Sequence, residues 1–397
     1  MTAIELPTTT RPMTAIGQTF ALLVDAYRHL AASRLFWITL VLSALAAGAF
    51  FFVGLSPNGV VLFFSVEFPA PYNSRLFSEA SFYRLMFTVL AIPWWLGVFA
   101  SALALVSVAG IFPDLLTGGA VELYVSKPLS RWRLFLTKYL GGLLFTAAQV
   151  TVFSLVAMLV MRVRGGVWEP GLLLAVPIVT LFFSYLFAIC VLVGVLTRST
   201  LAALLVTAIA WGGLGLLNFA DYGLSLATTV QEHRLAEREQ SVVQYQQIID
   251  RNAALPPEQR SNVTQFEFQR DRQRESIGEQ QRVVERLHWW QNLLNTVRTP
   301  LPKTGETLML LDRALLEPDS IFRMRSSISD FRAERRARAG REDDRDESHR
   351  DWERPSLVSE ARERIISRSL WWTIGSSMAF QVAILALAGW WFARRDF

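Results

Sequence analysis

The chain contains very little cysteine and lysine. Its single cysteine, Cys190, excludes an intrachain disulfide and lies in an apolar run, which is typical of a small buried side chain. Lysine occurs only at positions 127, 138 and 303, and none of the three follows a glycine. A phosphate-binding loop of the G-x-x-x-x-G-K-[ST] type needs a Gly-Lys pair, so the chain does not carry this motif. If the protein uses energy from ATP hydrolysis, a separate chain has to bind and hydrolyse the ATP.

The sequence also lacks the residue clusters that mark most enzymes. Its four histidines are scattered, without the His, Cys and carboxylate spacing of a metal site. Charged residues are nearly absent from the long apolar runs, which argues against an intramembrane protease dyad or proton relay. We therefore expect neither enzymatic activity nor a bound cofactor. An intramembrane enzyme remains a disfavoured alternative.

Long apolar runs dominate what is present, since 52% of the residues are hydrophobic. About 20 apolar residues in a helix cross the roughly 30 Å hydrocarbon core of a bilayer. Six runs meet this length, at residues 35–55, 85–112, 135–161, 171–196, 201–220 and 370–392. We predict an all-α integral membrane protein with six transmembrane helices. Because the first run begins late and no A-x-A cleavage site follows it, we expect no signal peptide.

Basic residues in the short loops predict the orientation of these spans. Arg28 and Arg34 precede the first run, a basic cluster lies between the second and third, and Arg198 lies between the fourth and fifth. The positive-inside rule places this side, and both termini, in the cytoplasm of a multi-pass protein of the inner or plasma membrane. Residues 1–34 then form a cytoplasmic amphipathic segment on the inner surface. Residues 35–220 hold the first five spans, and residues 369–397 hold the sixth span and a short cytoplasmic tail.

A long charged insert, residues 221–368, separates the fifth and sixth spans and is expected to be extracytoplasmic. Two stretches with partly heptad-spaced apolar residues flank Pro256-Pro257, which predicts a helical hairpin with a short coiled-coil seam. The seam residues are Leu235, Val242, Ile249, Ile277, Val284, Leu287 and Leu294. From residue 332 to 354 arginine alternates with acidic residues, which indicates a solvated stretch and no nucleic-acid partner.

The segment between the second and third spans, residues 113–134, differs from every other short loop. It begins with an acidic residue, continues through Gly118-Gly119 and a short amphipathic piece, and then reads K-P-L-S-R-W. Its basic residues could simply fix the topology of the protein. The same segment could instead form a helix on the inner surface that fits a groove in a soluble partner.

This segment resembles the first cytoplasmic loop of ABC-2 type permeases, the membrane subunits of ABC exporters that carry no ATPase domain of their own. Weaker likenesses are Leu196-Thr197-Arg198-Ser199, the segment 301–306 and the Arg-Asp tail at residues 394–396. One departure is Gly118-Gly119, where the family often has Glu-x-Gly. The resemblance implies that residues 113–134 form a coupling loop. Its implied coupling residues are Asp114, Gly118, Glu122, Lys127, Pro128, Ser130 and Arg131.

The resemblance also implies the partners of the chain. A separate ABC ATP-binding subunit, holding ATP and Mg²⁺, would dock on residues 114–133, and a second permease copy or homologue would complete the transporter in the lipid bilayer. No residue is assigned to substrate binding. The alternative function is a non-transporting membrane tether or sensor that binds an extracytoplasmic partner through the helical insert.

Overall fold

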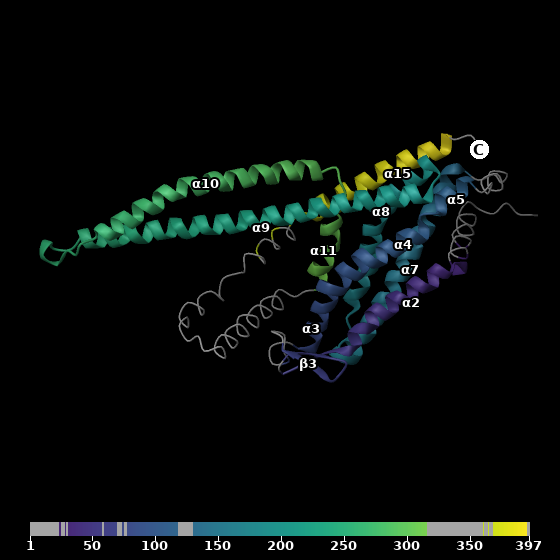
Figure 1. The fold of residues 1–397 in the computed structure, drawn as a ribbon, viewed down its shortest axis with the longest axis horizontal. Helices are drawn as coiled ribbons and strands as arrows, with labels where there is room; N and C mark the ends of the chain where they lie inside the picture. The colour runs from purple at the N-terminus through teal and green to yellow at the C-terminus, as the bar shows by residue number, and fades with distance from the viewer. Residues whose placement is uncertain are drawn as a thin grey trace, which may run out of the picture. The chain divides into compact units, whose positions relative to one another are not determined.

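The protein is mostly helical in a computed structural model (Figure 1). The structure describes residues 31–57, 59–69, 78–117, 130–315 and 368–394, together with Val24, Arg28, Ser74, Glu360 and Arg364. Its longer helices are α2 (Arg34–Ala49), α3 (Glu79–Leu85), α4 (Ser101–Val108), α5 (Ile111–Thr117), α7 (Arg131–Gly165), α8 (Ala175–Thr197), α9 (Thr200–Ala253), α10 (Thr264–Arg298), α11 (Thr304–Leu315) and α15 (Ser376–Arg394). The described residues form two compact units, the first within Met1–Trp211, Leu310–Phe331 and Gln381–Phe397, the second within Gly212–Met309 and Arg332–Phe380.

Six helices in the described part of the chain are long and apolar enough to cross a membrane, as predicted. They are Arg34–Phe52, Glu79–Leu116, Arg131–Gly165, Pro170–Thr197, Thr200–Ala253 and Trp371–Arg394. The second is π-helical from Met86 to Ala100, around Pro93. A proline inside a helix removes one backbone donor and crowds the preceding turn, and wider backbone bonding accommodates it.

A small antiparallel sheet follows the first of these helices and was not predicted. Its strands β1 (Val53–Ser56), β2 (Gly59–Leu62) and β3 (Val66–Pro69) form a meander in the order β1-β2-β3. Val53 pairs with Leu62, and Leu62 pairs with Val66. The first span is therefore shorter than the predicted 35–55, because residues 53–55 are extended, and the fold is mostly rather than wholly helical.

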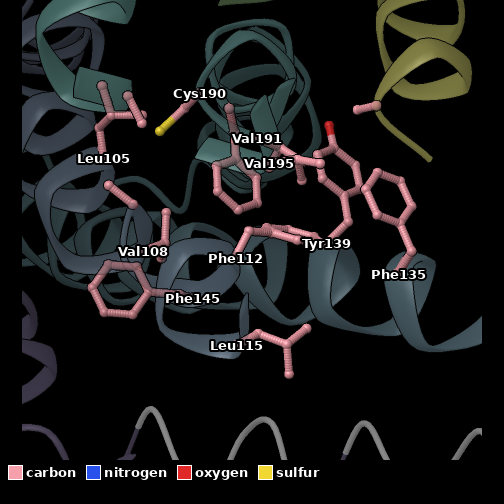
Figure 2. Close-up of a cluster of buried hydrophobic side chains, with 14 of the residues drawn as sticks. Leu105, Val108, Phe112, Leu115, Phe135, Tyr139, Phe145, Cys190, Val191 and Val195 are labelled. Carbon is pink, nitrogen blue, oxygen red and sulfur yellow. The ribbon is translucent and has the colours of Figure 1, made fainter. Parts of the chain in front are cut away.

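The core of the first unit lies between α2, α4, α5, α7, α8 and α15 and is rich in aromatic rings (Figure 2). Tyr139 stacks on Phe187 with ring centroids 5.2 Å apart and planes 8° apart. Its hydroxyl donates to the Ser184 carbonyl oxygen (2.9 Å) and accepts from the Gln381 side chain (3.0 Å), which ties α7 to α8 and α15. Cys190 is 1% exposed here, which confirms its prediction as a small buried side chain.

The second unit contains the predicted helical hairpin. Helix α9 continues without a break from its apolar part into the insert and ends at Ala253, beside Pro256-Pro257. Helix α10 then returns alongside it (Figure 1), with hydrogen bonds from Gln280 to Gln231 and from Arg270 to Gln246. The seven predicted seam residues are all buried or half-buried, so the heptad pattern identified the contact faces.

Candidate functional site

The predicted coupling loop is described only at its two ends. Asp114, Ser130 and Arg131 belong to the described residues, whereas Gly118, Glu122, Lys127 and Pro128 lie outside them. The structure therefore locates the elements from which the loop leaves and to which it returns.

The first end is helix α5, which is amphipathic. Phe112, Leu115 and Leu116 are buried, and Asp114 is exposed in the first turn. A carboxylate near a helix N-terminus is favoured because the backbone N–H groups there lack helical partners. The Asp114 side chain turns back over Gly110, since a methyl group placed on that glycine would lie 2.7 Å from Oδ2.

The second end is the start of α7. Ser130 is the N-cap residue, and its carbonyl oxygen accepts from the backbone N–H groups of Arg133 (2.9 Å) and Leu134 (3.1 Å). Arg131 donates through Nη1 to the carbonyl oxygen of Ala393, at 2.9 Å, in the last turn of α15. The final carbonyls of a helix have no helical donor and attract cations, so this contact stabilises the end of α15. The docking role predicted for Arg131 stays a prediction.

Three phenylalanine rings connect the two ends of the loop with the last span. Phe112 of α5 lies 5.1 Å from Phe135 of α7, measured between centroids, and both contact Phe392 of α15 at 6.5 and 5.8 Å. Trp132 packs so closely on Gly389 that any larger residue there would overlap its ring. A force applied to either end of the loop would thus act on α5, α7 and α15 together.

A second polar site lies in the second unit, at the base of the hairpin. It is a buried ion cluster formed by Asp221, Arg298, Glu306 and Arg368. These residues come from α9, the end of α10, the start of α11 and the segment before α15. Asp221, Arg298 and Glu306 are 3%, 3% and 6% exposed, so these three side chains are shielded from water.

The contacts in the ion cluster are close and shared. Asp221 accepts hydrogen bonds from Nη1 and Nη2 of Arg368, at 2.8 and 3.0 Å, and its Oδ2 lies 2.5 Å from Nη1 of Arg298. Glu306 Oε1 accepts from Arg298 at 2.7 Å and from Arg368 at 3.0 Å. Burial lowers the pKa of Arg368, but its hydrogen bonds with the two carboxylates outweigh that effect and leave the pKa raised.

Lys303 is the third cation of this region and is 1% exposed. Its ammonium donates to the carbonyl oxygens of Arg298 (3.3 Å), Thr299 (3.0 Å) and Leu301 (3.3 Å) and to the Ser376 hydroxyl (2.5 Å). It also lies 4.3 Å from the ring centroid of Trp372. Desolvation lowers the pKa of Lys303 to about 8; the charge of Glu306 opposes this shift, and the charges of Arg298 and Arg368 add to it.

Only indirect signals in the sequence point to the ion cluster. Asp221 immediately follows an apolar run, Arg368 shortly precedes another, and Lys303 and Glu306 lie in a segment noted only for its family likeness. Within the described residues, no group of three or more His, Cys, Asp or Glu side chains could hold a metal ion. Comparison of the chain with protein-family models, curated proteins and solved structures found no match.

Proposed function

We propose that this chain is the membrane-spanning permease subunit of an ABC-2 type ABC transporter that works as an exporter. The observation that carries the proposal is the position of the 113–134 segment. Its Asp114 lies near the end of the second of six long apolar helices, and its K-P-L-S-R-W string leads into the third, in the order that the family has.

In this proposal the energy comes from a separate ATP-binding subunit, which holds ATP and Mg²⁺ and docks on residues 114–133. Closure of that subunit pushes on α5 and α7, and the contacts among Phe112, Phe135 and Phe392 carry the movement to α15. A second permease copy completes the pathway. Both termini are cytoplasmic, and the hairpin of α9 and α10 is extracytoplasmic.

The test is co-purification of the tagged protein in mild detergent, followed by mass spectrometry and an ATPase assay. We expect an ATP-binding subunit in stoichiometric amount. Lys127→Glu should reduce its recovery by about tenfold, because it places a negative charge where the partner's acidic groups would pair. Lys127 is a better target than Arg131, whose contact with the Ala393 carbonyl makes its loss a structural change as well.

A matched control is Arg282→Glu, the reversal of a basic charge on the exposed surface of α10. It should leave recovery of the ATP-binding subunit unchanged. Equal recovery with the wild-type chain, Lys127→Glu and Arg282→Glu would reject docking on this loop. Absence of any ATP-binding subunit would reject the transporter function.

The second candidate function, a tether or sensor, rests on the hairpin. Helix α9 extends roughly 50 Å beyond its apolar part, and the hairpin exposes large apolar side chains such as Val243 (54%) and Phe268 (60%). Recovery of extracytoplasmic proteins alone, lost when residues 230–290 are deleted, would favour this function.

A further inference from the structure

The turn between β2 and β3 carries two bulky residues at backbone angles that large side chains rarely adopt. The Ser65 N–H donates to the Leu62 carbonyl oxygen at 3.3 Å, which makes Phe63 and Phe64 the central residues of a tight turn. Their φ angles are 51° and 62°, in the left-handed region. Hairpin turns with two such angles strongly prefer Asn and Gly, because a large side chain is strained there. Two adjacent phenylalanines at these positions indicate a role for their side chains.

These rings are also exposed. Phe63 is 68% and Phe64 is 56% exposed, and Phe52, Val66 and Phe68 nearby are between 43% and 50% exposed. Together they present roughly 500 Å² of apolar surface, at the upper end of what a monomeric soluble protein leaves in water. A surface of this kind indicates that something other than water covers it.

The sheet lies where two apolar helices end. Strand β1 begins directly after the first candidate span, Arg34–Phe52. Arg164, in the last turn of α7, lies 5.0 Å from the ring centroid of Phe64 and 5.9 Å from that of Phe51. Its Nε donates to the Tyr83 hydroxyl, which in turn hydrogen-bonds the carbonyl oxygen of Val53. The sheet is thus fixed to the ends of α2, α3 and α7.

The neighbouring side chains match the chemistry of a lipid headgroup layer. Trp168 is 57% exposed, and the Arg162 guanidinium lies 5.9 Å from its ring centroid. Among the described residues no carboxylate forms an ion pair with Arg162 or Arg164. Aromatic rings and arginines gather where hydrocarbon meets water, because the rings enter the acyl boundary and the guanidinium groups reach the phosphates.

We propose that the β1–β3 sheet is a membrane-docking element. It lies on the bilayer surface at the end of α2, with Phe63 and Phe64 at the boundary between headgroups and acyl chains. Lipid is the occupant because the patch continues the exposed apolar surface of α2, where Trp37, Val41 and Leu45 are between 54% and 62% exposed. Burial of the two phenylalanine rings in the bilayer then offsets the strain of the turn that holds them.

The proposal can be tested with an environment-sensitive fluorophore on a single cysteine. Phe64→Cys in a Cys190→Ala background, reconstituted in phosphatidylcholine and phosphatidylglycerol vesicles, carries the probe. Glu67→Cys is the matched control, because alternation along β3 turns Glu67 away from Val66 and Phe68. We expect lipids with a nitroxide high on the acyl chain to quench the probe at position 64 at least about threefold more strongly than at 67. Equal quenching, or none, would overturn the proposal.

A second variant separates lipid contact from turn formation. Phe63→Asn with Phe64→Gly supplies the residues that this turn geometry prefers, so the hairpin should form while both rings are lost. With the probe on Ser65→Cys, quenching should fall by about half or more relative to the chain that keeps both rings. Unchanged quenching would overturn the proposal. Efficient disulfide cross-linking between two copies through Phe64→Cys would also overturn it and assign the patch to a second chain.

Discussion

Replacing Asp221 with Asn removes the carboxylate that contacts both Arg298 and Arg368 while keeping the size of the side chain. The region then holds three cations, counting Lys303, against the single carboxylate of Glu306. Breaking a buried ion pair by removing one partner costs about 3–5 kcal/mol, because the remaining charge is left desolvated. Arg368 is partly solvated, with a side chain 22% exposed, so we expect the lower figure, about 3 kcal/mol.

The assay is thermal unfolding in mild detergent, followed by far-UV circular dichroism. For a unit of this size, about 3 kcal/mol lowers the midpoint by roughly 6–12 °C. The control is Asp271→Asn, the same substitution in an exposed pair on α10, where Asp271 lies 2.7 Å from Arg270 with a side chain 60% exposed. An exposed pair contributes at most about 1 kcal/mol, so the control should move the midpoint by no more than about 4 °C. Equal shifts for the two variants, or stabilisation by Asp221→Asn, would refute the argument.

The other predictions concern single positions. Because the folded-state pKa of Lys303 is depressed to about 8, the unfolded chain binds this proton more tightly between pH 8 and about 10.4, so the free energy of unfolding should rise across that window by up to about 3 kcal/mol. Lys303→Met should remove this rise. A free energy of unfolding that depends on pH in the same way in the variant and in the wild-type chain would contradict the prediction. Gly142→Ala places a methyl group 2.5 Å from the Phe187 ring and should lower the free energy of unfolding by about 1–3 kcal/mol. Gly213→Ala, with open space around it, should be neutral or stabilise by up to about 1 kcal/mol in the same melts. Tyr139→Phe removes a buried hydroxyl that bonds α8 and α15 and should cost about 1–3 kcal/mol.

Hydropathy alone predicted the six spans because a helix that crosses hydrocarbon must be apolar over about 20 residues. The boundaries were less predictable. Residues 53–55 extend the first apolar run, yet they belong to strand β1, because a short apolar run such as Val-Gly-Leu is compatible with a strand as well as with a span. Helix α9 runs through residue 221, where the insert was expected to begin, without a break. No proline interrupts α9 until Pro256, and the Glu, Gln and Arg residues of the insert are good helix formers.

The sheet and the ion cluster could not be predicted, for different reasons. Phe63-Phe64 is not a turn signal in any propensity, so no residue pattern marks a hairpin between β2 and β3. The ion cluster joins residues that are far apart in sequence, since Asp221 and Arg368 differ by 147 in residue number and Glu306 and Arg368 by 62. A single sequence shows the charges but not their partners, and only the packing of α9, α10, α11 and the segment before α15 brings these four residues together.

The unbroken course of α9 makes it a lever. A helix of 54 residues is about 80 Å long, and roughly 50 Å of it extends beyond Asp221. If the apolar part tilts in the bilayer by about 10°, a rigid helix carries its far end sideways by about 9 Å. The paired helix α10 stiffens this arm along its length. A small rearrangement within the membrane would therefore appear at the tip of the hairpin as a large displacement, and a load on the tip would act back on the span with the same mechanical advantage.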